Sequence, residues 1–128
     1  MSGDRVKYNP TEAEEQMTVI SWAKAMEYKH PELALLHHCP NGGSRHRVEA
    51  ARLKAQGVKA GVPDLFLPVA RNGKHGLFIE MKRRRGGRIE PEQKKWIAAL
   101  LEQGYEVYVC KGADAAIEVI KRYLEGEG

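Results

Sequence analysis

The amino-acid sequence predicts a single α/β domain in which helices flank one mixed central β-sheet. Two observations favour this fold class. Stretches with apolar residues at helical spacing alternate along the chain with short apolar runs that are bounded by Gly, Pro and Asn. The length of 128 residues also suits one hydrophobic core rather than two. We therefore expect one domain over residues 1–128, with its core at about 11–124.

The first helix is predicted to begin after Thr11. Glu14 follows three residues later, which is the spacing of a capping box, and His30-Pro31 marks the end of the helix. Its apolar stripe consists of Val19, Ile20, Trp22, Ala23 and Met26. Residues 33–38 form a short apolar run that leads into a glycine-rich loop, so we expect a strand there.

The middle of the chain predicts a polar helix followed by a hairpin. The helix covers residues 47–56 and precedes Gly57. Residues 62–69 form an apolar run interrupted only by Asp64 and prolines, which indicates a buried strand. Residues 71–74 have the composition of a turn, and residues 77–82 are predicted to be the next strand.

The last third predicts a helix, a strand and a helix. The first helix is expected to start near Pro91 and to stop at Gly104, since proline favours the first turn of a helix and glycine the residue beyond its end. Residues 105–109 are predicted to be a strand, and 113–124 the last helix. The apolar stripes are Trp96, Ile97, Leu100 and Leu101 in one helix and Ala116, Ile117, Ile120 and Tyr123 in the other. Without the short polar helix, the order is α-β-β-β-α-β-α.

Positive charge is concentrated in the middle of the chain. The net charge is +4, but residues 41–95 hold 14 Lys and Arg against 5 Asp and Glu. The two flanking segments are net negative, with 4 against 6 in residues 1–40 and 3 against 6 in residues 96–128. This distribution predicts a polyanionic partner such as a nucleic acid.

The remaining composition favours a cytoplasmic protein without a membrane partner. No apolar stretch approaches the ~20 residues that a membrane-spanning helix needs, and the N-terminal residues lack the apolar region of a signal peptide. Cys39 and Cys110 follow no metal-ligand spacing, so we expect reduced thiols. No organic cofactor is predicted.

Two carboxylates and one lysine are the strongest candidates for catalysis. Glu80 and Lys82 are two residues apart on one predicted strand and therefore share a face. A hairpin between the two central strands would bring Asp64 to Glu80. Two carboxylates that approach closely repel each other unless they share a proton or a metal ion. Because no His or Cys accompanies them, the donor set favours Mg²⁺ or Mn²⁺.

These residues also resemble a known nuclease superfamily. Asp64 followed by Glu80-Met81-Lys82 resembles the PD-(D/E)XK pattern, and Pro63 supplies its proline. The segments PNGG, GVKAGVPD and PEQ look like the virus-type replication-repair nuclease (VRR-NUC) branch, most of all its stand-alone, phage-encoded members. The similarity extends from about Thr11 to Leu124. It implies a restriction-endonuclease-like core, a metal-dependent endonuclease that hydrolyses DNA, and a location in the cytoplasm of a bacterium or of a phage-infected host.

The resemblance implies roles for the three candidate residues. Asp64 and Glu80 would be metal ligands, with the backbone carbonyl of Met81 as a third. Lys82 would orient or activate the attacking water and stabilise the charge that develops on the phosphate.

The resemblance adds a glutamate from the first helix and a glutamine from a later one. Glu14 is explained by the capping box, so Glu12 and Glu15 are the alternatives. We prefer Glu12 because it lies four residues before Gln16, the Glu-x-x-x-Gln spacing of the family. Gln93 occupies the position of the family's glutamine near the active site.

Two polar loops are candidates for contact with nucleic-acid phosphates. Their residues are Asn41, Ser44, Arg45 and Arg47 in the first loop and Arg83, Arg84, Arg85 and Arg88 in the second. Resolvase-type relatives act on branched or flapped DNA, which makes such DNA a candidate substrate. Cutting both strands of a junction needs two sites, so a homodimer is expected.

Two other functions fit parts of the same pattern. A nucleic-acid-binding module of this fold that has lost catalysis would also be basic, but it would not need the paired carboxylates. A nuclease that acts on RNA would need the same catalytic residues, and the sequence holds no base-reading motif that separates the two nucleic acids.

Overall fold

The computed structural model describes residues 8–42 and 46–126. Its order of elements agrees with the predicted α-β-β-β-α-β-α order, with a 3₁₀ helix and the short polar helix added. The elements are α2 (Glu12–Ala25), η1 (Pro31–Leu35), β1 (His37–His38), α3 (Arg47–Ala55), β2 (Leu65–Leu67), β3 (Leu77–Lys82), α4 (Pro91–Glu102), β4 (Glu106–Lys111) and α5 (Ala113–Glu125).

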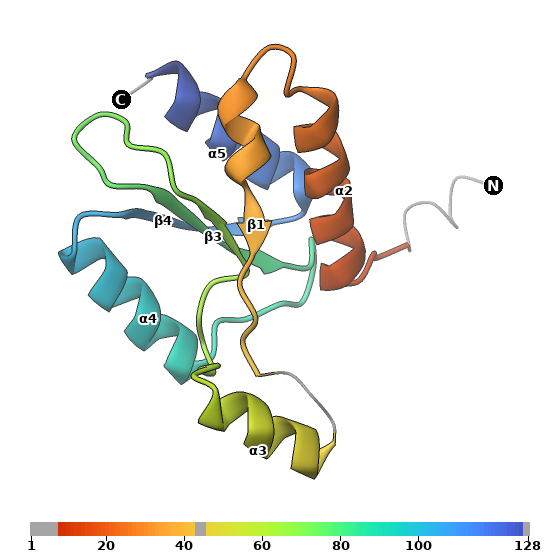
Figure 1. Cartoon of the computed structure of the whole chain (residues 1–128). Coiled ribbons are helices and arrows are strands. Elements are labelled where there is room, and N and C mark those ends of the chain that lie inside the picture. The colour runs from red at the N-terminus through yellow and green to blue at the C-terminus, as the bar shows by residue number, and fades with distance from the viewer. Residues whose placement is uncertain (1–7, 43–45, 127–128) are drawn as a thin grey trace.

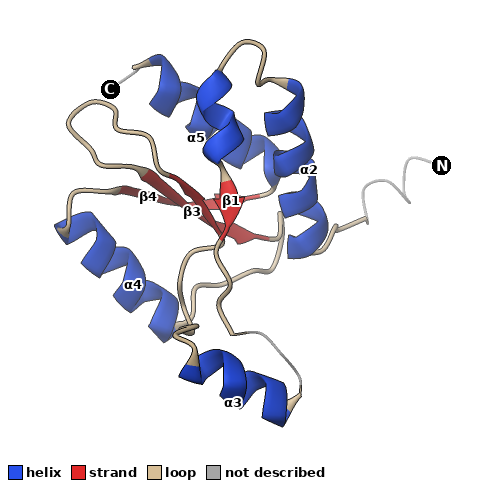
Figure 2. Ribbon diagram, viewed as in Figure 1, coloured by secondary structure: helices blue, strands red, loops and turns tan. Residues whose placement is uncertain are grey.

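One mixed sheet forms the centre of the fold, with strand order β1-β2-β3-β4. The pairs β1–β2 and β2–β3 are antiparallel, and β3–β4 is parallel. Helices α2 and α5 lie on one face of the sheet and α4 on the other, while α3 projects beyond the sheet (Figures 1 and 2). The predicted α/β fold with a mixed sheet is therefore confirmed. None of the described helices is long and apolar enough to cross a membrane.

The central strand β3 has two chemically different faces. All six of its residues are buried. Leu77, Ile79 and Met81 belong to the hydrophobic core, together with Val19 of α2 and Ile120 of α5. The alternate residues Phe78, Glu80 and Lys82 point to the opposite face, because successive side chains of a strand alternate. One short segment thus serves both the core and a polar site.

The hairpin that brings β2 to β3 turns at Asn72-Gly73. Both residues have positive φ, 51° and 78°, which is the conformation that a two-residue type I′ turn requires. Arg71 and Lys74 pair across the turn, as expected from the sequence. In the ladder that follows, Leu65 pairs with Ile79, so Asp64 lies across from Glu80.

Four predicted elements differ from the structure by two residues or more at a boundary. The first helix ends at Ala25 instead of His30-Pro31, and hydrogen-bonded turns occupy the residues between. Of residues 33–38, only His37–His38 form a strand, because Pro31 begins a 3₁₀ helix that buries Leu33.

The strand predicted over 62–69 is confined to Leu65–Leu67. Pro63 and Pro68 flank it, and a proline has no N–H to donate to the ladder. The strand predicted over 105–109 instead covers Glu106–Lys111.

The packing of the helices agrees with the predicted stripes except in α4. Residues Val19 and Ala23 of α2, and Ala116 and Ile120 of α5, are buried. No residue of α4 is buried, and Leu101 is 49% exposed although its spacing predicts a place on the apolar side. The helix α4 is therefore more exposed to solvent than α2 and α5.

Candidate active site

Asp64 and Glu80 face each other at the end of the β2–β3 ladder. The side chain of Asp64 accepts two hydrogen bonds, from the Met81 backbone N–H at 2.7 Å and from Asn41 Nδ2 at 3.2 Å. These contacts hold the carboxylate against the end of β3. Glu80 is 1% exposed, so its charge has little contact with water.

The environment of Glu80 disfavours its ionised form. Burial raises its pKa to about 8, and the neighbouring Asp64 carboxylate adds to the rise, whereas Lys82 lowers it. Glu80 Oε1 is buried and has no hydrogen-bond partner among the described residues. A buried carboxylate oxygen without a partner is costly, and a proton or a cation at this position would remove that cost.

Lys82 and Gln93 complete the site. The ammonium of Lys82 lies 3.7 Å from Glu80 Oε2 and donates to Gln93 Oε1 at 3.0 Å. Gln93 Nε2 in turn donates to Glu80 Oε2 at 2.9 Å. Gln93 Oε1 also accepts from the Glu90 N–H at 2.8 Å as part of the capping box of α4, so Gln93 ties this helix to β3. Lys82 is 4% exposed, so its ammonium is buried beside the Glu80 carboxylate.

The structure separates the two glutamates of the first helix. Glu15 is buried on the other side of the sheet, where its oxygens accept from Arg84 Nε at 2.8 Å and from the Ala113 N–H at 2.9 Å. Glu12 is exposed, and its charge is among those that raise the pKa of Glu80. Of the two, Glu12 is the one whose charge is among the causes of the raised pKa of Glu80.

Gln16 connects the same helix to the site by a second route. Its Nε2 lies 3.2 Å from His38 Nδ1, and that nitrogen lies 2.9 Å from the carbonyl oxygen of Asp64. Sequence reasoning used Gln16 only for its spacing from Glu12 and gave His38 no role at the site, since the contact depends on how β1 pairs with β2.

Comparisons with known proteins agree with this arrangement. The family model of the VRR-NUC domain matches residues 5–114. The chain belongs to the VRR-NUC family. A solved structure described as a "VRR_NUC domain protein" is 39% identical and superposes with a TM-score of 0.79, covering 92% of this chain and 91% of that one. A search of curated proteins gave no match. The family has a nuclease-type fold, which agrees with the expectation from the sequence.

The basic loop of this VRR-NUC domain has two kinds of arginine. All four predicted phosphate-contact residues of the loop, Arg83, Arg84, Arg85 and Arg88, are exposed. Arg84, however, pairs with the buried Glu15, and Arg85 donates to the Tyr8 carbonyl at 3.1 Å. These two arginines therefore connect separate parts of the chain, a role that the charge run alone did not indicate.

The other predicted loop is described only in part. Asn41 contacts Asp64, so it positions a carboxylate as well as lying near the surface. Arg47 is the exposed first residue of α3. Ser44 and Arg45 lie outside the described residues.

A cationic hollow adjoins Lys82 on the β4 side of the VRR-NUC site. It has a volume of about 690 Å³, and its lining includes Lys82, Arg88, Lys94 and Lys111. One carboxylate, Glu90, also lines it and lies 3.5 Å from Arg88 Nε. Sequence reasoning missed Lys94 and Lys111. Lys111 lies beside Lys82 because β4 pairs with β3 in parallel, and only the register of that pairing reveals it.

The donor set fits a hard divalent cation. Among residues 8–42 and 46–126, no three His, Cys, Asp or Glu side chains cluster as metal ligands. The protein therefore offers the carboxylates of Asp64 and Glu80, one oxygen of which lacks a partner. Mg²⁺ usually binds through one or two carboxylates and takes its other ligands from water and substrate phosphate, so this pair suits it.

Proposed function

We propose that this VRR-NUC protein is a divalent-metal-dependent endonuclease that hydrolyses the phosphodiester bonds of DNA. The observation that carries the proposal is the buried pair of Asp64 and Glu80, in which Glu80 Oε1 has no hydrogen-bond partner among the described residues. A structural carboxylate would have its oxygens satisfied. A second carboxylate and a buried lysine beside this one are the parts that metal-assisted hydrolysis of a phosphodiester needs.

Asp64 and Glu80 would hold the metal ion, Mg²⁺ or Mn²⁺, with the backbone carbonyl of Met81 as a further ligand. The bound cation would supply positive charge to the scissile phosphate and to an attacking water. Asn41 and the Met81 N–H would keep the Asp64 carboxylate in position before the metal binds. Glu12 would act from the rim of the site, where its charge influences Glu80.

Lys82 would stabilise the charge that develops on the phosphate and orient the water. Its ammonium is buried and within reach of Gln93 Oε1, so its position is restricted before substrate arrives. Gln93 would hold Lys82 and Glu80 in register through its two ends. A preorganised cation of this kind acts on the transition state without further rearrangement.

The substrate backbone would follow the cationic surface around the site. Arg83 and Arg88 of the basic loop, with Lys94 and Lys111 of the hollow, would neutralise phosphates on either side of the cut. We propose branched or flapped DNA as the preferred form. Cutting both strands at a branch would require two copies of this site, hence a homodimer, which light scattering of the purified protein would detect.

A cleavage assay tests the proposal directly. Linear, flapped and four-way DNA substrates and a matched RNA are incubated with Mg²⁺, with Mn²⁺ or with EDTA. We expect cutting of DNA with either metal and none in EDTA. Full activity in EDTA would contradict the metal mechanism, and preferential cutting of RNA would overturn the substrate. Tight binding without cutting under every metal condition would favour an inactive binding module.

A further inference from the structure

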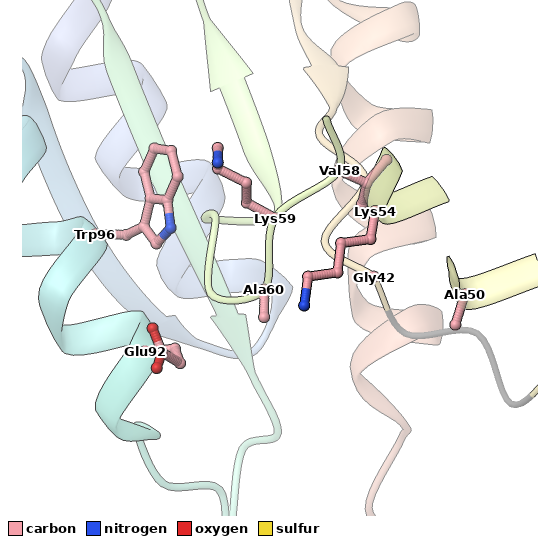
Figure 3. A pocket seen from close by; sticks show the side chains of 8 residues that line it. All are labelled: Gly42, Ala50, Lys54, Val58, Lys59, Ala60, Glu92 and Trp96. Atoms are coloured by element: carbon pink, nitrogen blue, oxygen red, sulfur yellow. The ribbon is translucent and has the colours of Figure 1, made fainter. Parts of the chain in front are cut away.

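A second pocket lies beside the active site, on the side opposite the cationic hollow. It has a volume of about 510 Å³, within the ~300–1,000 Å³ typical of small-ligand sites. Its wall is formed by α3, by the loop at residues 58–60 and by α4 (Figure 3). Gly42, the residue after the Asp64 partner Asn41, also lines it. The pocket is therefore connected to the site through adjacent residues.

The spacing of residues on α4 places the active site between the two hollows. Gln93 points to Glu80 and Lys82. Glu92 and Trp96, one turn apart, line the pocket, whereas Glu90 and Lys94, also one turn apart, line the cationic hollow. At about 100° per residue, these pairs fall on either side of Gln93. A nucleic-acid strand that crosses the site would reach both hollows.

The lining of the pocket differs chemically from that of the cationic hollow. Trp96 contributes an indole ring, and Figure 3 shows it on the same side of the pocket as Glu92, with Lys54 and Lys59 across from α4. Neither lysine has an ion-pair partner in the part of the chain that the structure describes. Glu92 Oε2 lies 3.7 Å from Nζ of Lys95, a residue that does not line the pocket.

The loop is held against α4 by a close backbone approach. Gly61 has a φ of +92°, and a Cβ on it would lie 2.6 Å from the backbone of Glu92. A larger residue there would push the loop away from α4. This side of the pocket is therefore held in place by the packing of the loop against α4. By contrast, α3 has no buried residue, so one side of the pocket has little packing of its own.

We propose that this pocket binds an unpaired nucleobase of the substrate, stacked on Trp96, with Lys54 and Lys59 on the flanking phosphates. The inference rests on the proposed action on nucleic acids and adds the part of the substrate that is recognised. An indole offers a stacking surface to any base. The Glu92 carboxylate repels phosphate but accepts hydrogen bonds from the amino groups of a base. Phosphates therefore suit the two exposed lysines, and a base suits the side of the pocket that Glu92 and Trp96 form.

Tryptophan fluorescence tests the contact without catalysis. In a Trp22→Phe variant, Trp96 is the sole tryptophan, and Ca²⁺ in place of Mg²⁺ prevents cutting. A duplex with a short single-stranded overhang should quench the emission, because a stacked base quenches an indole. A fully paired duplex of the same charge, and an overhang whose bases are replaced by abasic sites, should not. Equal quenching by all three probes, or quenching by none, would overturn the pocket.

Substitution of Trp96 provides the second arm. Trp96→Leu should weaken binding of the overhang duplex about 5- to 160-fold, the range for loss of one stacked base, and Trp96→Phe should restore most of it. Neither change should affect the abasic probe. A loss that is the same on the normal and abasic overhangs would reflect a structural effect and contradict the proposal.

Substitution of the two pocket lysines should change the salt dependence of binding and not the response to the base. Lys54→Ala with Lys59→Ala should lower the salt dependence of binding by up to roughly two units of log–log slope on normal and abasic overhangs alike, whereas Lys24→Ala with Lys121→Ala should not. An unchanged slope would contradict the proposed phosphate contacts of Lys54 and Lys59.

The failure of the pocket and the failure of the proposed function are distinguishable. DNA cleavage without a fluorescence response of Trp96 would overturn the proposed base pocket and leave the proposed nuclease activity intact. A fluorescence response of Trp96 without cleavage under any metal condition would support the base pocket and overturn the proposed nuclease activity.

Discussion

Two glutamates of this protein are almost fully buried, and they lie on opposite faces of the sheet. Glu15 is 2% exposed and Glu80 is 1% exposed. Both oxygens of Glu15 accept a hydrogen bond, from Arg84 and from the first residue of α5. Glu80 has one oxygen without a partner among the described residues, and a second carboxylate beside it.

The difference shows that burial alone does not separate a structural carboxylate from one that is proposed to bind a metal ion. Glu15 joins α2, the basic loop and the start of α5, so its charge is balanced by the fold itself. The charge of Glu80 is balanced only in part by Lys82, and burial and Asp64 raise its pKa to about 8. An incomplete set of partners is the feature expected of a group that is completed by a metal ion and substrate.

The largest expected effect is the loss of cutting in Asp64→Asn or Glu80→Gln. Each change removes one of the two carboxylates proposed to hold the metal, so cleavage should fall by about 10³-fold or more. Circular dichroism and thermal unfolding should show an intact fold. Single-turnover cleavage with Mg²⁺ measures the loss, and unimpaired turnover in either variant would mean that the site is misplaced.

Lys82→Ala should have the next largest effect on cutting. The change removes the cation that is proposed to act on the transition state, so the single-turnover rate should fall by roughly 10²- to 10³-fold. DNA affinity, measured with Ca²⁺, should change only a few-fold, because several other cations are proposed to contact the DNA backbone. Lys95→Ala, an exposed lysine of α4, is the matched control. A variant that binds weakly but cuts at the normal rate would assign Lys82 to binding.

Glu15→Gln should affect stability and spare chemistry. The amide cannot satisfy both the Arg84 guanidinium and the Ala113 N–H, so the free energy of unfolding should fall by about 1–3 kcal/mol. The folded fraction should cut DNA at the normal rate. Urea unfolding measures the loss, with Glu102→Gln on the exposed side of α4 as the control. A strong loss of kcat without a loss of stability would place Glu15 in the active site after all.

The two glutamates should also differ in their effect on stability as the pH changes. Since the pKa of Glu80 rises from 4.5 to about 8 on folding, the folded state holds this proton more tightly than the unfolded state. Its contribution to stability is therefore fully present below pH 4.5 and is lost as the pH rises through about 8. In EDTA, Glu80→Gln should gain stability relative to the wild type over this window. A constant difference would mean that Glu80 does not titrate there.

The smallest effect should come from the exposed arginines. Arg83→Ala with Arg88→Ala should reduce the salt dependence of DNA binding by up to roughly two units of log–log slope, with little change in stability. Arg84→Ala should instead lower stability, because it leaves Glu15 without its guanidinium partner. Titrations at several NaCl concentrations and urea unfolding separate the two outcomes. If Arg84→Ala lowered the salt dependence of binding and left stability unchanged, as expected for Arg83, then Arg84 would be a binding arginine and not a structural one.

The amino-acid sequence by itself determined the features that depend on near neighbours in the chain. The capping box of Thr11 and Glu14, the Asn72-Gly73 turn and the six-residue strand with Glu80 and Lys82 all follow from local spacing. The hairpin prediction was enough to bring Asp64 to Glu80. The strands predicted over 33–38 and 62–69 were too long, because a 3₁₀ helix takes up most of the first run and Pro63 and Pro68 confine the second to Leu65–Leu67.

Only the tertiary structure decided which distant residues share the site. Glu12 and Glu15 lie within one turn of the same helix, yet one influences Glu80 and the other is bonded to Arg84 and Ala113. Lys111 lies beside Lys82 through the register of two strands, which depends on the packing of the whole sheet. Local spacing determines the face on which a residue lies. Which residues that face contacts depends on how distant segments of the chain pack against one another, because all of these contacts form together in the folded core.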